Sequence, residues 1–273
     1  MTSDERFYDE GPRFQFGSNW RRFLCSLDNN QIVEAEESIK RMLQLDSLQG
    51  KTFIDVGSGS GLSSLAARRL GDVYSFDYDP ESVACTQYLK DQFFPGDPDW
   101  IVSTGSVLDS EWLRVLGRYD IVYSWGVLHH TGSMWQALDN IDSLVTPGGK
   151  LFISIYNDQG WLSDFWRAVK RLYNRMPPAL RFTLLLPSLV ILWGPRTAKD
   201  LLRLRPFESW RTYQRLRGMS PWSDLVDWVG GYPFEVARPQ MIVDSFVKRG
   251  YRLEKLNSCG RKLGCNEFVF IKT

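Results

Sequence analysis

The chain has 273 residues, and its 33 Lys or Arg side chains against 32 Asp or Glu give a formal net charge of +1. This length suits one large domain or a core domain with an embedded accessory segment, and the near-zero charge offers no argument for a nucleic acid, an anionic membrane or an acidic substrate. The four cysteines are scattered and form no Cys-x-x-Cys pair, which predicts reduced thiols and no zinc cluster.

The first fifty residues are predicted to form an N-terminal helical lid. The segment Met1–Glu10 is acidic and polar. It does not resemble a secretory leader, so we expect a cytoplasmic protein. The apolar residues of Gln31–Leu45 recur at helical spacing, which predicts a leading helix packed on the domain that follows. Four aromatic residues between these segments are candidates for a lid over a ligand site, with core packing as the alternative: Phe14, Phe16, Trp20 and Phe23.

Residues 51–157 alternate short β-branched runs with amphipathic stretches, the pattern of βαβ units on a parallel sheet. Together with residues 223–273 they predict a Rossmann-like, doubly wound α/β core with a terminal antiparallel hairpin. Pro147, Gly148 and Gly149 mark the turn into the fifth strand. The predicted strands are Thr52–Val56, Val73–Asp77, Trp100–Ser103, Asp120–Ser124, Lys150–Tyr156, Arg252–Leu256 and Glu267–Ile271. The predicted core helices are Gly61–Leu70, Pro80–Phe93, Met134–Leu144 and Gln240–Arg249.

The sharpest signal is the loop after the first strand, where Asp55 is followed by glycines at positions 57, 59 and 61. Glycine permits positive φ and lets a ligand touch the backbone, so this turn predicts a cofactor shelf at the carboxyl edge of the sheet. A dinucleotide fingerprint would require a third glycine at Gly-x-Gly-x-x-Gly spacing, but Leu62 and Ser64 occupy those positions. A phosphate-binding loop would need a lysine after the glycines, and the first is Lys90. The loop therefore favours a cofactor without phosphates.

A second acidic residue, Asp77, ends the next strand about twenty residues after Gly57. A carboxylate at that place can accept hydrogen bonds from both hydroxyls of a ribose. An ordinary βα connection explains a glycine turn alone, but it does not explain Asp55 and Asp77 at matching strand ends. The combination predicts a nucleoside-containing cofactor.

With these residues, Thr52–Tyr156 resembles the class I S-adenosylmethionine-dependent methyltransferases, particularly the small-molecule branch of ubiquinone- and menaquinone-pathway enzymes. The resemblance implies that Gly57, Gly59 and Gly61 lie beside the methionine part of S-adenosylmethionine, that Asp55 anchors that end through the loop, and that Asp77 binds the ribose. It further implies that Tyr78 flanks the adenine, that the stretch Gly105–Val107 closes over it with Ser106 near the amino group, and that the product is S-adenosylhomocysteine.

The fourth strand ends in Ser-Trp-Gly-Val-Leu-His-His, with Trp125 matching the family segment beneath the sulfonium. His129 and His130 are the only histidines in the chain. Their place at a strand end makes one of them a candidate base for an acceptor hydroxyl, with packing and polar satisfaction as the alternative. Methyl transfer needs little further side-chain chemistry, because the protein mainly aligns the reactants and excludes water. We expect no metal.

Residues 158–222 differ in character and are predicted to form an inserted helical cap. They hold twelve Lys or Arg against four Asp or Glu, about +8, which leaves about −7 for the remainder of the chain. The most apolar run, Leu184–Trp193, is about ten residues long and contains Pro187, which falls short of the ~20 residues of a membrane-spanning helix. Three interpretations stay open, in order of preference: a lid over a small acceptor, a peripheral contact with an anionic membrane that supplies a lipid acceptor, and a nucleic-acid surface.

Four polar or aromatic residues are candidates for acceptor binding. Tyr156 and Asn157 end the fifth strand, whereas Tyr232 and Glu235 belong to an aromatic loop after the cap that could also be a plain connection. The prediction is a methyltransferase acting on a small molecule, first on a hydroxyl of a phenolic, lipid-linked or sugar-like acceptor. An RNA or protein acceptor bound by the basic cap is the second reading, and a catalytically silent cofactor-binding or interaction protein is the third.

Overall fold

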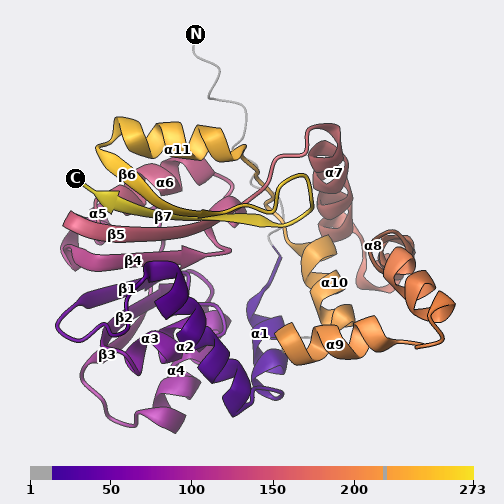
Figure 1. The fold of residues 1–273 in the computed structure, drawn as a ribbon, viewed down its shortest axis with the longest axis horizontal. Helices are drawn as coiled ribbons and strands as arrows, with labels where there is room; N and C mark the ends of the chain where they lie inside the picture. The colour runs from indigo at the N-terminus through magenta and orange to yellow at the C-terminus, as the bar shows by residue number, and fades with distance from the viewer. Residues whose placement is uncertain (1–13, 218–219) are drawn as a thin grey trace.

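A seven-stranded sheet forms the centre of the computed structural model, which describes residues 14–217 and 220–273, without the side chains of residues 214–217. The strand order is β3-β2-β1-β4-β5-β7-β6, and all neighbours are parallel except the pairs made by β7. The sheet fills the left of Figure 1. The strands are β1 (Thr52–Val56), β2 (Asp72–Asp77), β3 (Trp100–Thr104), β4 (Tyr119–Trp125), β5 (Val145–Tyr156), β6 (Tyr251–Asn257) and β7 (Cys265–Lys272).

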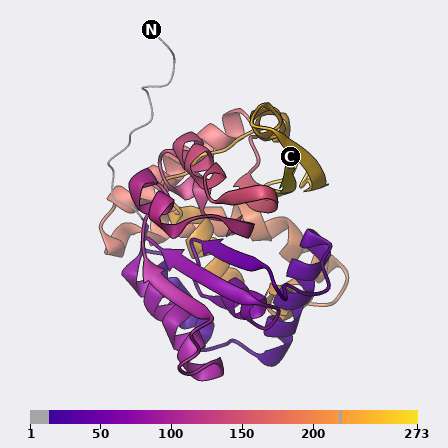
Figure 2. The same ribbon diagram turned by 90° about the vertical axis from the view of Figure 1, so that its left-hand side faces the viewer.

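Helices cover both faces of the sheet, as the turned view in Figure 2 shows. Alternate residues of a strand face opposite sides, so Phe53 joins the apolar cluster under α2, α3 and α4, and Ile54 joins the cluster under α5, α6 and α11. The helices are α1 (Gly17–Leu24), α2 (Asn29–Leu43), α3 (Leu62–Arg68), α4 (Pro80–Phe93), α5 (Ser110–Leu116), α6 (Met134–Asp142), α7 (Trp161–Arg175), α8 (Phe182–Leu202), α9 (Glu208–Arg217), α10 (Pro221–Gly230) and α11 (Pro239–Lys248), with short 3-10 turns η1 (Leu128–His130) and η2 (Pro178–Leu180).

The predicted Rossmann-like core with its terminal hairpin is confirmed, and most element bounds agree within two residues. The leading helix starts earlier than predicted because Asp28 caps it, exchanging hydrogen bonds with Gln31 in a capping box. The predicted turn at residues 147–149 lies inside β5, where the pairing shifts from Tyr119–Val145 to Ile121–Lys150 and the glycine segment bulges out. Helices α1 and α5 were not predicted.

Helices α7 to α10 form the cap, on the right of Figure 1. Their buried side chains make a third apolar cluster, separate from the two clusters of the sheet, that includes Trp166, Tyr173 and Leu225. Helix α10 begins at Pro221, with the Ser220 side chain as its cap. The cap therefore continues past the predicted boundary at residue 222.

The apolar run of the cap is longer than predicted. Helix α8 passes through Pro187 and Pro195 without ending. Among the described residues, one helical segment, Pro178–Leu202, has the length and apolar composition that a membrane-crossing helix needs. The expectation that the apolar run falls short of the ~20 residues of a spanning helix was wrong for the helix that contains it, because proline removes one helical hydrogen bond without stopping a helix whose other side is packed.

Candidate functional site

The glycine loop links the carboxyl end of β1 to α3 and is held against β2. The backbone N–H of Gly57 donates to the carbonyl oxygen of Phe76 over 2.8 Å. Gly57, Gly59 and Gly61 all have positive φ, of 86°, 55° and 81°. A Cβ on Gly57 would overlap the side chain of Val127, so the first glycine is required by space as well as by conformation.

Asp77 joins this loop to the end of β2. One carboxylate oxygen accepts a hydrogen bond from the backbone N–H of Gly59, and the other from the backbone N–H of Asp79, both over 2.9 Å. A carboxylate offers about four acceptor positions, so these two hydrogen bonds leave acceptor capacity for a ligand hydroxyl. Burial raises the pKa of Asp77 to about 6, against the lowering effect of these two N–H groups.

Asp55 lies under the same loop and is buried. Its carboxylate accepts from the Ser64 hydroxyl over 2.6 Å, and a chain of bonds continues from Ser75 to Ser64 and from the indole N–H of Trp100 to Ser75. Burial raises the pKa of Asp55 to about 7, with the Ser64 hydrogen bond opposing it. Asp55 reaches the pocket that the loop lines, and it also ties β1 to α3 and β2.

The side of the pocket assigned by resemblance to adenine is formed by segments that follow β2 and β3. Tyr78 lines the pocket and is largely exposed, and Ser106 and Val107 line it from the loop after β3. Gly105 sits directly on the ring of Trp112, which leaves no room for a side chain there. Tyr78, Ser106 and Val107 therefore all line the pocket, as the resemblance to the family implies.

Helix α1 closes the pocket from the N-terminal side. The backbone N–H of Gly17 donates to the Asp79 carboxylate over 2.9 Å, which anchors the helix at the start of α4. Trp20 then lies against Gly59, whose added Cβ would be 3.2 Å from the indole nitrogen. All four predicted lid aromatics line the pocket: Phe14, Phe16, Trp20 and Phe23. Residues 1–13 of the predicted lid lie outside the described residues.

Trp125 ends β4, and the two histidines follow it in η1. The indole N–H of Trp125 donates to the Glu267 carboxylate over 2.7 Å, which fixes the ring at the pocket rim beside β7. His130 lines the pocket, and its ring lies 4.9 Å from that of Phe16. His129 is fully buried behind the pocket, 4.0 Å from the Tyr156 ring, and does not line it. The geometry narrows the candidate base to His130.

The tautomer of His130 follows from its partner. Its Nδ1 lies 2.6 Å from the carbonyl oxygen of Pro233, and a carbonyl can only accept, so Nδ1 carries the proton. Nε2 is therefore the acceptor nitrogen. Burial, together with the charge of Lys170, lowers the pKa of His130 to about 3. The imidazole is thus neutral at physiological pH.

Of the four predicted acceptor-binding residues, Tyr156 and Tyr232 line the pocket, and Asn157 and Glu235 do not. The Asn157 side chain donates to the carbonyl oxygen of Gly260 and accepts from Asn266, so it holds the β6–β7 turn. The Glu235 carboxylate accepts from the backbone N–H of Met134 and caps α6, a favourable place for a negative charge. Both roles depend on partners far along the chain.

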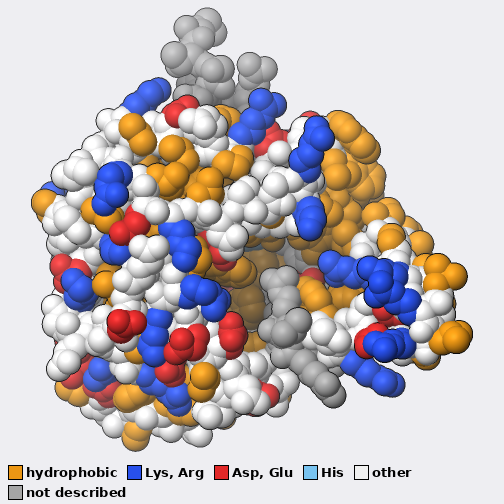
Figure 3. All heavy atoms as spheres, in the orientation of Figure 1, with side chains coloured by type: hydrophobic (Ala, Val, Ile, Leu, Met, Phe, Trp, Pro, Cys, Tyr) orange, Lys and Arg blue, Asp and Glu red, His pale blue; other side chains and the backbone are white. Residues whose placement is uncertain are grey.

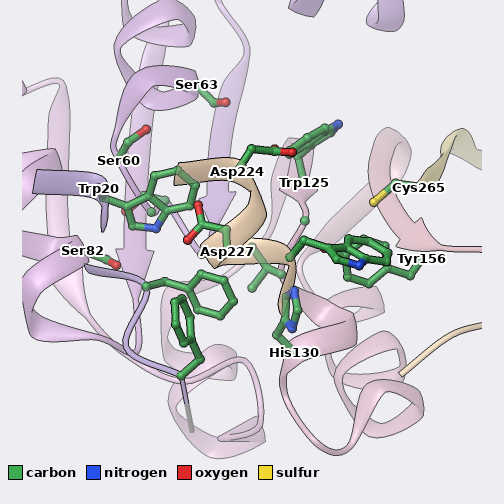
Figure 4. Close-up of a pocket in the computed structure, with 18 of the residues that line it drawn as sticks. Trp20, Ser60, Ser63, Ser82, Trp125, His130, Tyr156, Asp224, Asp227 and Cys265 are labelled. Atoms are coloured by element: carbon green, nitrogen blue, oxygen red, sulfur yellow. The ribbon is translucent and has the colours of Figure 1, made fainter. Parts of the chain in front are cut away.

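The contribution of α10 to the pocket was not predicted from the sequence. Asp224, Asp227 and Trp228 project from this helix into the pocket, and Figure 4 shows Asp227 beside Trp20 and Asp224 near Trp125. Asp227 accepts a hydrogen bond from the amide of Asn19 in α1. Burial raises the pKa of Asp227 to about 7, with the Asn19 hydrogen bond opposing it. No local pattern marks these residues, because α10 reaches the glycine loop only through the tertiary fold.

The pocket as a whole encloses about 1530 Å³, more than a single drug-sized ligand needs. Its described lining holds seven carboxylates, and only Arg196 and Lys262 are cations. Among the described residues, no cluster of three or more His, Cys, Asp or Glu side chains could hold a metal ion. The seven carboxylates belong to Glu34, Asp55, Asp77, Asp79, Asp224, Asp227 and Glu267.

These residues fit S-adenosylmethionine. The Asp77 carboxylate can accept from the ribose hydroxyls, Tyr78 lines the part of the pocket assigned to the adenine, and the glycine backbone suits the methionine end. The acidic lining favours a ligand with a sulfonium and an ammonium group, and it disfavours a dinucleotide with two phosphates. The fit is therefore one of charge as well as shape.

Known proteins resemble the chain in sequence and in fold. It is 31% identical over 109 residues to a tRNA U34 carboxymethyltransferase of Pseudoalteromonas translucida, covering 40% of this chain and 33% of the relative. It is 30% identical over 144 residues to the ribosomal protein L11 methyltransferase of Methylococcus capsulatus, covering 50% of this chain and 44% of the relative. The chain thus spans less than half the length of either relative.

Among solved structures, the magnesium protoporphyrin IX methyltransferase of Synechocystis PCC 6803 with bound S-adenosylhomocysteine superposes with a TM-score of 0.55, at 14% identity and over 94% of both chains. This likeness concerns the fold. The family model of the methyltransferase domain matches residues 27–224, more than two thirds of the chain. The chain therefore belongs to the methyltransferase domain family, with the fold of the class I S-adenosylmethionine-dependent enzymes.

Proposed function

We propose that this protein transfers a methyl group from S-adenosylmethionine to a hydroxyl of a small phenolic, lipid-linked or sugar-like molecule. The observation that carries the proposal is the composition of the pocket, which joins an acidic end at the glycine loop to an aromatic end around His130. At the aromatic end the rings of Tyr156 and Trp228 meet edge to face, with their centroids 5.4 Å apart. A flat acceptor can stack there without meeting a phosphate-binding group.

The charge of the pocket supports the cofactor assignment. When bound, S-adenosylmethionine supplies a methyl group already activated on a sulfonium. Asp77 and Asp227 add negative charge on two sides of the glycine loop, and Trp20 covers it from α1. The low-dielectric surroundings strengthen attraction for a cation, and the aromatic cover excludes water from the transferring carbon.

His130 has a defined part in this proposal. Its Nδ1–H is held by Pro233, so Nε2 can accept the hydrogen bond of the acceptor hydroxyl and orient the oxygen. S-adenosylmethionine would supply the methyl group to that oxygen, and the hydroxyl proton would pass to Nε2. A base with a pKa of about 3 is sufficient, because an oxygen that bonds to a methyl group becomes far more acidic than imidazolium.

The same charge distribution supports methyl transfer over carboxymethyl transfer. The tRNA relative is named for a carboxymethyl group, which would bring a carboxylate to the transfer site and would require a nearby cation. In this pocket Glu267 holds Trp125, and Asp224 lies close by. Another anion beside these groups would be destabilised.

An RNA or protein acceptor is the second candidate, because the cap carries an excess of eight positive charges and because of the names of the two sequence relatives. A macromolecular acceptor would have to present a flipped base or side chain to the aromatic end past an acidic rim. The small-molecule reading needs no such step.

The deciding experiment is transfer of label from S-adenosylmethionine, carrying tritium in its methyl group, to a bacterial extract separated into lipid-soluble, small polar, RNA and protein fractions. We expect label in either of the first two fractions. This label should be reduced at least tenfold with His130→Asn and retained with His129→Asn. Label confined to RNA or protein would overturn the small-molecule assignment. Cofactor binding without label in any fraction would favour the catalytically silent alternative.

A further inference from the structure

Helix α7 carries an exposed apolar stripe. Trp161, Phe165, Ala168 and Leu172 follow one another at intervals of four, three and four residues, which places them on one side of the helix. All four are exposed, and Trp161 is 78% accessible. The opposite side of the helix, including Trp166, is buried against the rest of the cap. The stripe is therefore largely open to solvent among the described residues.

Helix α8 carries a second set of exposed apolar residues. Its first fourteen residues, 182–195, contain no charged side chain, and Arg181 and Arg196 flank them. Leu186 is 52% exposed and Val190 is 68% exposed. The buried side of the helix carries Trp193, which packs on Trp210 of α9 at 5.1 Å. We call the exposed set the apolar cap face: Trp161, Phe165, Ala168, Leu172, Leu180, Phe182, Leu186, Val190 and Ile191.

Figure 3 shows hydrophobic side chains gathered over α7, with Lys and Arg side chains concentrated over α8 and α9. Soluble monomers seldom leave a contiguous apolar surface of this kind uncovered. The cations include Arg175 at the end of α7 and Lys199 and Arg203 at the end of α8, all exposed. An apolar face bordered by cations matches the acyl and phosphate layers of an anionic lipid surface.

Within Pro178–Leu202, whose overall length and composition suit a membrane-crossing helix, the uncharged run itself is too short to cross and indicates a helix lying on a bilayer. Fourteen residues rise ~21 Å, which is shorter than the ~30 Å hydrocarbon layer. In addition, Asp200 near the end of α8 accepts two hydrogen bonds from Ser209, so α8 is tied to α9 within the cap. Only one side of the helix is available to lipid.

We propose that the apolar cap face docks this protein on the surface of an anionic bilayer. In this arrangement the stripes of α7 and α8 enter the interface between headgroups and acyl chains, and Arg175, Lys199 and Arg203 contact lipid phosphates. The segregation of about +8 on residues 158–222 from about −7 on the rest of the chain orients this segment towards the membrane. The remainder of the protein faces away.

The docked surface and the pocket share a helix. Leu192 and Arg196 of α8 line the pocket, whereas Leu186 and Val190 lie on the exposed side. A lipid-borne acceptor would therefore reach the pocket over a short path along α8. The docking inference itself does not depend on the transfer chemistry, and its test uses no activity.

The test is sedimentation of the full chain with vesicles of phosphatidylcholine alone or with 30% phosphatidylglycerol. We expect binding to the anionic vesicles that weakens as salt is raised from 0.1 to 0.5 M, and little binding to the neutral ones. The double substitution Leu186→Asp and Val190→Asp should lower the partition coefficient at least about tenfold. Its matched control is Val115→Asp with Val247→Asp, two exposed positions on α5 and α11 that should leave binding unchanged.

A second measurement does not rely on those variants. Brominated acyl chains should quench tryptophan fluorescence of the unmodified protein, and Trp161→Phe should reduce that quenching. Failure of the intact protein to sediment with anionic vesicles at 0.1 M salt would overturn the proposal. So would equal loss of binding in both double variants, or a dimer in solution that only Leu186→Asp and Val190→Asp dissociate, because a second copy would then cover the face. Binding of RNA that is abolished by the same substitutions would also count against it.

Discussion

Substitution of Asp77 by Asn tests the cofactor site most directly. The carboxylate accepts from the backbone N–H groups of Gly59 and Asp79 over 2.9 Å and keeps acceptor capacity for the ribose hydroxyls. The amide has one acceptor oxygen and no charge, so at least one charge-assisted hydrogen bond to the ligand is lost. Such a bond contributes ~1.5–3 kcal/mol, which raises the Kd for S-adenosylhomocysteine roughly 10- to 150-fold.

Calorimetric titration measures the Kd, and thermal unfolding measures the accompanying loss of stability. Asp120→Asn is the matched control, because this carboxylate accepts from the backbone N–H of Thr52 over 2.8 Å and from its hydroxyl over 3.0 Å at the opposite end of β1. We expect the control to lower Tm without changing the Kd. A folded Asp77→Asn protein whose Kd lies within threefold of the parent would refute the assignment of Asp77 to the ribose.

Four further predictions concern the pocket and its loop. Burial raises the pKa of Asp77 to about 6 and of Asp227 to about 7. The stability that their protonated forms contribute is therefore present below about pH 4 and is lost as pH rises to 7. The Tm of the cofactor-free protein should fall over that pH range. A bound sulfonium favours the ionised carboxylates, so affinity should rise from pH 5 to pH 8, with proton release seen as a buffer-dependent binding enthalpy in calorimetry. His130→Gln should lower kcat at least tenfold with an unchanged cofactor Kd, whereas equal kcat values would remove its role with the acceptor. Gly57→Ala should lower the free energy of unfolding by ~2–5 kcal/mol in chemical denaturation, because of the positive φ and the steric overlap. The control Gly96→Ala should lower it by ~1–2 kcal/mol, because its φ is +71° but its added Cβ has no described atom within 4 Å. Equal losses in the two variants would contradict the overlap.

The sheet and the glycine loop could be predicted from the sequence because their signals are local. A buried parallel strand reads as a short β-branched run, as at Thr52–Val56, and its bounds agree with the structure. Glycines at alternate positions and Asp77 at the next strand end lie within a single βαβ unit, so their meeting follows from the connection rules of parallel sheets. The first strand, its loop and the second strand thus needed no knowledge of distant residues.

The tertiary structure decided the rest of the pocket. Asp227 reaches Asn19 across 208 positions of chain, and Trp125 reaches Glu267 across 142. No periodicity records such pairs, because each helix or strand satisfies its own pattern whichever neighbour it meets. For the same reason the sequence could not show that the Glu235 carboxylate accepts a hydrogen bond from the first turn of α6 and does not contact the acceptor site. Local spacing determined the cofactor shelf. The docking of α1 and α10 over this shelf determined the shape and charge of the site, and it is driven by burial of apolar surface between distant segments.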